Sequence, residues 1–309
     1  MTPATTDKQL SWRERSVKTA SGECVVSVII PHYNDLDNLR RCLQLLAEQT
    51  APTGSFEIVV ADNNSHCGLA EVEAVCAGIA RVAPAPIQGA GEARNAGVAA
   101  SHGAVLAFID SDCRPAADWI ERGLAAMSRA NVIGGRVEVD VRDPANPTGA
   151  EAFEKVFAFN FKRYIEEVGF SGSGNLFVRR EDFERVGGFR SVVAEDLDWG
   201  RRATAMGLRL AYADDVVVSH PARYDWDELK NLWRKRTAEA YAIAREKRCG
   251  RLLWFFRSWA ILASPFAHSV KVLRSKKLTG MDQKAKAVAV LFRLRAWRFI
   301  ETNRLLFSR

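Results

Sequence analysis

VLAFIDSDC, residues 105–113, is the strongest structural signal in this chain, because an apolar run leads directly into Asp110 and Asp112. The run is typical of a buried strand, and acids at i and i+2 after it lie on the same side of that strand, at the rim of a sheet. Two hard oxygen donors there suit Mg²⁺ or Mn²⁺, which usually keep substrate phosphates as further ligands. Asp-Ser-Asp is also ordinary turn chemistry, so the motif by itself leaves a metal site and a plain turn both open.

The residues before this stretch alternate between strand and helix patterns. CVVSVII, 24–30, is a continuous β-branched run that ends at a proline, and residues 56–61 form a second apolar run; both predict buried strands. Leucines at three- and four-residue spacing predict a helix over 36–46, and residues 92–101 read as an Ala-rich helix. This order of elements predicts an α/β fold with a mainly parallel sheet flanked by helices.

Polar residues stand where each predicted strand ends. Ligands of such sheets bind beyond the carboxyl ends of the strands. We therefore expect Asp35, Asp62, Asp110 and Asp112 to converge there. Asp35, or Asp37, can also cap the helix that follows the first strand.

Residues 132–222 are less regular. They predict a strand over 132–139 and an aromatic helix that runs from Phe153 through Phe157 and Phe161 to Tyr164. A glycine-rich loop, GFSGSGN, follows at 169–175.

The glycines of GAGEARNAG, 89–97, resemble a dinucleotide-binding loop, but the context argues against one. Ala83-Pro84-Ala85-Pro86 precedes them instead of a strand, and the third glycine comes too late. Arg94 in this segment can bind a diphosphate or hold a neighbouring aspartate, and a surface arginine is an equally good interpretation.

Two later sites each have a structural and a chemical interpretation. Glu195-Asp196-Leu197-Asp198 fits a helix start, where acids suit the positive end of the dipole and arginines one turn later can pair with them. An acid in this group can equally serve as a general base. His220 follows an apolar run, where a structural histidine is common and a ligand for Mn²⁺ is the alternative.

The charge of the chain is unevenly distributed. The net charge is +7, but residues 223–309 carry 21 Lys/Arg and 7 Asp/Glu, which gives +14 there and −7 in residues 1–222. A basic tail of this kind favours an anionic surface. Residues 1–24 read as a polar arm without a secretory signal, and six cysteines without a C-x-x-C pair favour a reduced, cytosolic chain.

The tail contains two apolar segments. Residues 252–266 are too short for a bilayer span, which needs about 20 apolar residues, and they include Arg257 and Pro265. Residues 287–297 place an apolar face on a basic amphipathic helix, which can lie in the headgroup plane of an anionic membrane or pack on the rest of the protein. Trp233-Arg234-Lys235-Arg236 can contact a diphosphate, lipid phosphates or water.

Taken together, six motifs resemble family 2 glycosyltransferases of GT-A fold. They cover about residues 25–222 and occur in the order VSVIIPHYND, EIVVADNNS, GEARNAG, FIDSD, GSGNLFVRREDFERVGGF and AEDLDWGRRATAMG. The resemblance implies a GT-A nucleotide-sugar-binding and catalytic domain over 25–222, with a sheet of mixed, mainly parallel strands. Outside it, composition and charge indicate a polar N-terminal arm (1–24) and a basic amphipathic helical C-terminal region (223–309).

The resemblance implies an inverting, metal-dependent reaction that transfers a sugar from a nucleotide-sugar donor to a hydroxyl acceptor. By position, Asp196 matches the catalytic base, with Glu195 and Asp198 as neighbouring acids, and Asp112 and His220 match ligands of Mn²⁺ or Mg²⁺. The donor-binding positions that it implies are Pro31, Tyr33, Asp35, Asp62, Asn63, Arg94, Asp110, Asp112, Gly174 and Asn175. Asn63 departs from the family, which usually has an acid there; a UDP-sugar is favoured, and the nucleobase stays open.

The tail leads us to expect an enzyme of polysaccharide biosynthesis at the inner face of the plasma membrane. Its acceptor would be a lipid-linked or cell-surface glycan, and no nucleic-acid partner is expected. Two alternatives remain at this point: a non-catalytic protein of the same fold that binds a nucleotide or a membrane surface, and a nucleotidyltransferase.

Overall fold

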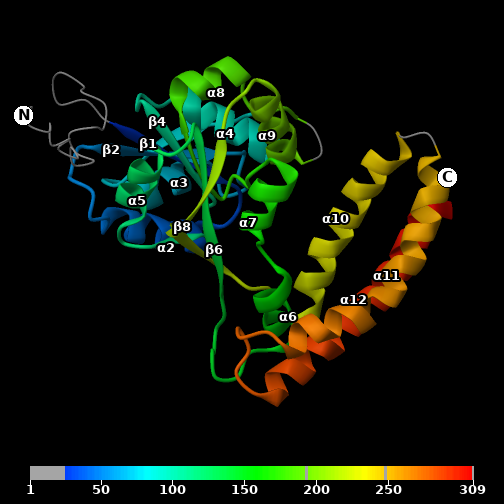
Figure 1. Cartoon of the computed structure of the whole chain (residues 1–309). Helices are drawn as coiled ribbons and strands as arrows, with labels where there is room; N and C mark the ends of the chain where they lie inside the picture. Colours follow the sequence, from blue (N-terminus) through cyan, green and yellow to red (C-terminus); the bar gives the residue numbers. More distant parts are fainter. Residues whose placement is uncertain (1–24, 192–193, 247–248, 308–309) are drawn as a thin grey trace, which may run out of the picture. The chain divides into compact units, whose positions relative to one another are not determined.

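The computed structural model describes residues 25–191, 194–246 and 249–307. The predicted arm, residues 1–24, lies outside them. The described chain forms two compact units (Figure 1): unit 1 holds the residues up to Val137 together with Phe161–Val218, and unit 2 holds Glu138–Asn160 and the residues from Ser219 onward. Residues 138–160, which the sequence grouped with the catalytic segment, thus join the C-terminal helices.

The structure contains an eight-stranded mixed sheet in the order β3-β2-β1-β4-β7-β6-β8-β5. Strands β1, β2, β3 and β4 pair in parallel, whereas β7 runs antiparallel to both β4 and β6. The strands are β1 (Val26–His32), β2 (Phe56–Asp62), β3 (Arg81–Pro84), β4 (Val105–Ile109), β5 (Arg114–Pro115), β6 (Val132–Asp140), β7 (Asn175–Arg179) and β8 (Leu210–Pro221). The predicted α/β fold with its mixed, mainly parallel sheet is confirmed.

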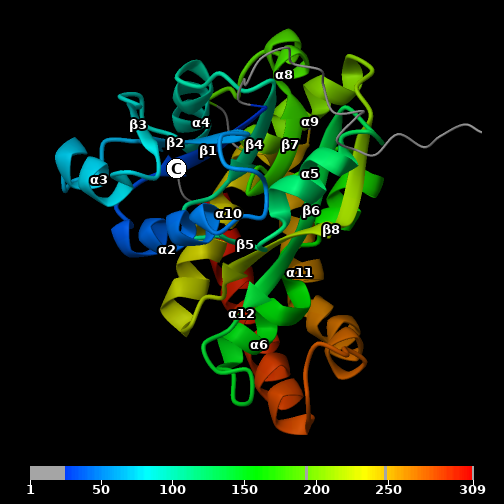
Figure 2. The same cartoon turned by 90° about the vertical axis from the view of Figure 1, so that its left-hand side faces the viewer.

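Helices flank this sheet in unit 1 and make up most of unit 2 (Figure 2). In unit 1 they are α2 (Leu36–Ala47), α3 (Leu69–Cys76), α4 (Ala90–Ala99), α5 (Trp119–Ala126), α7 (Phe161–Arg163), the π-helix η1 (Tyr164–Val168), α8 (Arg180–Val186) and α9 (Glu195–Ala205). In unit 2 they are α6 (Gly149–Phe157), α10 (Trp226–Arg245), α11 (Gly250–Leu273) and α12 (Met281–Phe307).

Three local expectations were wrong. The first strand does not end at Pro31 but continues to His32, and Pro31 lies beyond the last β1–β4 pair, where it needs no N–H. A strand does precede the glycines at 89–97: β3 lies at the edge of the sheet and ends at Pro84. The aromatic helix from 153 to 164 is broken at Phe159, which has a φ of +50°, because its two halves pack in different units.

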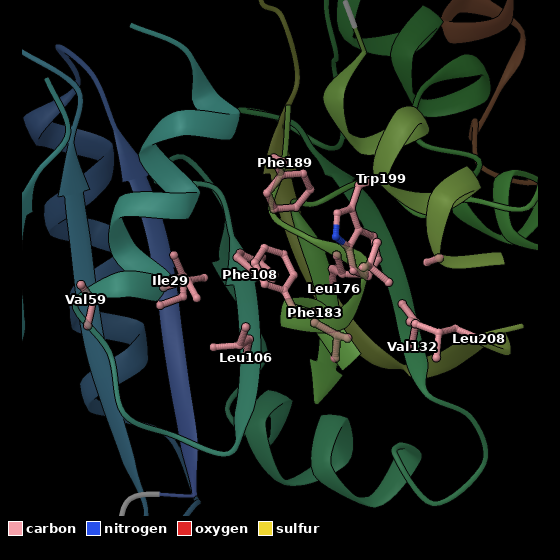
Figure 3. Close-up of a cluster of buried hydrophobic side chains, with 14 of the residues drawn as sticks. Ile29, Val59, Leu106, Phe108, Val132, Leu176, Phe183, Phe189, Trp199 and Leu208 are labelled. Atoms are coloured by element: carbon pink, nitrogen blue, oxygen red, sulfur yellow. The ribbon is translucent and has the colours of Figure 1, made fainter. Parts of the chain in front are cut away.

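A hydrophobic core cluster of unit 1, with four aromatic side chains among its aliphatic ones, lies between the sheet and helices α4, α8 and α9 (Figure 3). Phe108 of β4 meets Phe189 edge-on at 5.5 Å, and Phe183 stacks on Trp199 at 5.6 Å. Along β7, the side chain of Phe177 points to the opposite face of the sheet from its neighbours Leu176 and Val178, and it contacts Trp119 of α5. Helix α5 therefore covers that opposite face. This packing holds the carboxyl end of β4 and the start of α9 in place.

Unit 2 has its own apolar core. Helices α11 and α12 form an antiparallel pair (Figure 1). Between them, Trp254 Nε1 donates to the Thr302 carbonyl at 3.0 Å. Ala287, Leu291 and Leu294 of α12 are buried against α6, α10 and α11. The apolar face that the sequence offered to a membrane, on 287–297, is therefore filled by the protein's own helices.

Candidate active site

The end of β2 is held by a buried histidine on the neighbouring strand. His32 Nδ1 lies 3.1 Å from Asp62 Oδ1, and its Nε2 accepts from the Asp35 N–H at 3.2 Å. Ser65 Oγ donates to Asp62 Oδ1 at 2.6 Å. His32 and Ser65 lie in the first two of the six motifs, but no local pattern in the sequence indicates a role for them. They keep Asp62, which is only 5% exposed, in one orientation.

Asn63 organises the loop between β3 and α4. Its two N–H bonds go to the carbonyls of Ala85 and Ile87, at 2.8 and 2.7 Å, and its Oδ1 accepts from the Gly89 N–H at 2.8 Å. A primary amide has two N–H donors, so this side chain has none left for a nucleobase in this arrangement.

The loop after β1 contributes one exposed ring and one cap. Tyr33 is 47% exposed, and its hydroxyl lies 3.3 Å from His66 Nε2. Asp35 caps α2 by accepting from the Asn38 N–H at 3.2 Å, so the first of the two predicted caps is the one used. Pro31 is half-buried within β1.

Arg94 joins three segments that are distant in sequence. Its Nη2 donates to Asp110 Oδ1 at 2.6 Å and its Nη1 to Glu195 Oε1 at 3.2 Å. The side chain is buried, with 4% of Arg94 exposed, which excludes a surface arginine. Burial acts to lower the pKa of Arg94, but the charges of Asp110 and Glu195 outweigh it and raise the pKa, so Arg94 stays charged. The guanidinium links the carboxyl end of β4 to the first turn of α9.

Asp196 follows Glu195 directly and has an altered acidity. Burial and the charge of Glu195 raise the pKa of Asp196 to about 6, and Arg94 and the Leu197 N–H limit the rise. A carboxyl group of this pKa changes protonation near neutral pH, as a general base must. Asp198, two residues on, pairs with Arg202 Nε at 2.9 Å, as the helix-start interpretation predicts.

Asp110, Asp112 and Cys113 form a group of potential metal ligands. One ligand atom of each lies within 4.8 Å of the others. Burial and the two acids raise the pKa of the Cys113 thiol well above its usual value, so it is protonated and a poor ligand for a hard cation. Arg94 already holds Asp110 Oδ1. The donor set that fits Mg²⁺ or Mn²⁺ is therefore the Asp112 carboxylate, with Asp110 Oδ2 beside it.

The glycine-rich loop before β7 passes close to Asp110. A Cβ on Gly174 would come within 2.7 Å of Asp110 Oδ2, so a larger residue would push this carboxylate out of its present position. Asn175 is fully buried: its amide donates to the carbonyls of Arg136 and Val216 and accepts from Trp119 Nε1. It therefore ties strands together and offers a ligand no exposed atom.

His220 lies in the part of β8 that belongs to unit 2. Its ring packs 4.7 Å from the ring of Phe159, and its Nδ1 lies 2.7 Å from the Pro221 carbonyl. Its role as a metal ligand stays a prediction.

The candidate site thus consists of carboxylates at the ends of parallel strands, a buried arginine and an acid of raised pKa. The family model for glycosyl transferase family 2 matches residues 27–187, and this chain belongs to that family. The glycosyltransferase AglE of Haloferax volcanii is 36% identical over 217 residues, which cover 68% of this chain and 71% of that protein.

Solved structures share the fold. Mannosyltransferase PcManGT from Pyrobaculum calidifontis, in complex with GDP-Man and Mn²⁺, has a TM-score of 0.55 and 19% identity, and the match covers 95% of this chain and 90% of that one. S. aureus TarS 1–349 in complex with UDP-GlcNAc has a TM-score of 0.50 and 17% identity over 88% and 72% of the two chains. The chain is a glycosyltransferase of GT-A fold, and membership of this family sets the nucleotidyltransferase alternative aside.

Proposed function

We propose that this enzyme transfers a sugar from a nucleotide-sugar donor to a hydroxyl acceptor, with inversion at the anomeric carbon and with Mn²⁺ or Mg²⁺ as cofactor. The observation that carries the proposal is the network of Arg94 with Asp110 and Glu195, next to an Asp196 whose pKa is about 6. The PcManGT and TarS structures, with their nucleotide sugars, support the donor class.

In this mechanism Asp196 removes the proton from the attacking hydroxyl, and the oxygen attacks the face opposite the leaving nucleoside diphosphate. Only the unprotonated form of Asp196 can do so. Arg94 keeps Asp110 and the start of α9 at a constant separation, which fixes the base relative to the donor site. A divalent cation held by Asp112, with Asp110 Oδ2 beside it, would neutralise negative charge on the departing diphosphate.

Donor hydrolysis by the purified protein tests the proposal. We expect slow release of one nucleoside diphosphate from a panel of UDP-, GDP- and dTDP-sugars with Mn²⁺ or Mg²⁺, and no release with EDTA. Asp112→Asn should lose both the release and any rise in melting temperature on addition of the metal, because it removes the principal carboxylate ligand. A folded wild-type protein that neither hydrolyses nor is stabilised by any donor would instead be the non-catalytic relative.

We further propose that the acceptor is a lipid-linked or cell-surface glycan and that unit 2 docks on the anionic inner face of the plasma membrane. None of the described helices is both apolar and long enough to cross a bilayer. The apolar side chains that α11 exposes support surface docking, with Leu253 and Phe256 at 60%, Trp259 at 53% and Phe266 at 73%. Basic helices with exposed aromatic side chains bind anionic bilayer surfaces.

Vesicle flotation checks this docking. We expect the full-length protein to float with vesicles of phosphatidylglycerol and phosphatidylcholine and to float less with phosphatidylcholine vesicles. The double variant Phe256→Glu, Trp259→Glu should lose binding at least 10-fold, because it places two charges in the apolar contact. Ile87→Glu, at a 62% exposed position in unit 1, serves as the control and should bind like the wild type. Equal flotation of all three proteins would rule out α11 as the docking face.

A further inference from the structure

Unit 2 gathers three arginines around one indole ring. The Arg298 guanidinium carbon lies 4.1 Å from the centre of the Trp233 ring, and those of Arg236 and Arg295 lie 5.6 and 5.7 Å from it. Arg236 and Trp233 come from α10, and Arg295 and Arg298 come from α12. The ring attracts these cations through its quadrupole, but it brings no negative charge to the cluster.

Among the described residues, Arg295 and Arg298 of this cluster have no acidic partner. Arg298 is 6% exposed, and the Nε atoms of Arg298 and Arg295 are buried without a hydrogen-bond partner in the part of the chain that the structure describes. Within residues 25–191, 194–246 and 249–307, no carboxylate forms an ion pair with Arg236, Arg295 or Arg298. Glu301, on the same helix as Arg295 and Arg298, forms its ion pair with Arg304, whose Nη2 lies 2.6 Å from Glu301 Oε1.

Burial and mutual repulsion act against these charges. Burial, with the nearby charges of Arg295, Arg257 and Arg236, lowers the pKa of Arg298 to about 9. Arg298 is thus still a cation at neutral pH, in a place where a cation is unfavourable without an anion. An anion bound here would remove the repulsion and occupy the unused N–H groups.

We propose that Arg236, Arg295 and Arg298 form a binding site for a phosphate group, held between α10 and α12. Guanidinium groups bind phosphate oxygens through paired N–H bonds, and several of them can share one phosphate. This site is separate from the proposed transfer reaction and does not depend on it. The phosphate can be free or lipid-borne. The exposed apolar side chains of Leu253 and Phe256, on neighbouring α11, favour a lipid-borne phosphate.

Thermal unfolding of the full-length protein tests the site, in phosphate-free buffer with EDTA so that no metal recruits phosphate to the acids of unit 1. The probes are inorganic phosphate, octyl phosphate and octanol. We expect inorganic phosphate at saturation to raise the melting temperature by about 2 to 5 °C. Tenfold tighter binding of octyl phosphate would assign a lipid-borne phosphate, whereas equal affinity would assign free phosphate. Stabilisation by octanol equal to that by octyl phosphate would contradict the proposal.

Arg298→Met should abolish the phosphate effect and raise the melting temperature in phosphate-free buffer, because it removes a buried, unpaired charge and keeps most of the packing. Arg236 is exposed, so Arg236→Gln should fold even if Arg298→Met does not. It should weaken phosphate binding about 10-fold. Arg293→Met is the matched control: Arg293 is exposed on α12 and lies over a different ring, that of Trp226, at 4.0 Å. An undiminished phosphate effect in the first two variants, or an equal loss in the control, would refute the site.

Discussion

Asp196→Asn is expected to reduce the rate of sugar transfer by 10²- to 10⁴-fold, the usual contribution of a general base. In the wild type the rate should rise with pH through about 6, because Asp196 must lose its proton to act and its pKa is about 6. The variant should show no such rise. The measurement is the transfer rate from pH 5 to 8 with saturating donor and metal.

The same substitution should stabilise the protein at neutral pH. The pKa of Asp196 is raised from 3.8 to about 6 on folding, so its contribution to stability falls as the pH rises through this range. Asparagine carries no charge, and the variant should gain about 1 to 3 kcal/mol over the wild type at pH 7. Urea unfolding at pH 4 and pH 7 measures this difference.

Asp198→Asn is the matched control on the same helix. Asp198 pairs with Arg202, and Arg202 also donates to the carbonyls of Val186 and Gly188, so the local structure should survive its loss. We expect this variant to stay within about 10-fold of the wild-type rate and to keep the pH dependence. If Asp196→Asn behaved in the same way, Asp196 would not be the base.

Arg94→Met is expected to cause the second large effect. It leaves Asp110 and Glu195 without their shared cation, and breaking a buried ion pair costs about 3 to 5 kcal/mol. The two acids are 36% and 28% exposed, and water therefore lowers the expected loss to about 2 to 3 kcal/mol. Urea unfolding measures it.

The pH profile distinguishes the electrostatic effect of Arg94 from its mechanical one. Arg94 lowers the pKa of Asp196, so Arg94→Met should move the rise in transfer rate to a pH above 6. Arg94→Lys keeps the charge but loses the planar fork that reaches both acids. It should therefore keep the profile near 6 with a lower rate. An unshifted profile in Arg94→Met would show that Arg94 does not set the acidity of the base.

The strands and helices that form the site were largely predictable because their signals are local. The run before Asp110 is buried β4 as predicted, and the acids of 195–198 begin α9. The short strand β3 and the break at Phe159 were missed, since an edge strand has little apolar pattern and an aromatic helical pattern continues across the break.

The interactions inside the site depended on distant residues. No local pattern shows that the Asn63 amide donates its N–H groups to carbonyls of the loop before α4, or that Asn175 is buried between strands. The exposure of the apolar segments in residues 223–309 also depended on distant residues. The apolar face of 287–297, which the sequence offered to a membrane, is covered by α6, α10 and α11, whereas α11 exposes several apolar side chains of 252–266.

The amino-acid sequence by itself determined the family, most of the strands and helices that form the site and the acids at their ends, because periodicity and turn chemistry act over a few residues. The tertiary structure decided that Arg94 joins Asp110 to Glu195 and that burial and the charge of Glu195 raise the pKa of Asp196. It also decided that arginines of two helices meet at Trp233. These properties depend on burial and on distances between charges, which exist only once segments far apart in the chain have packed together.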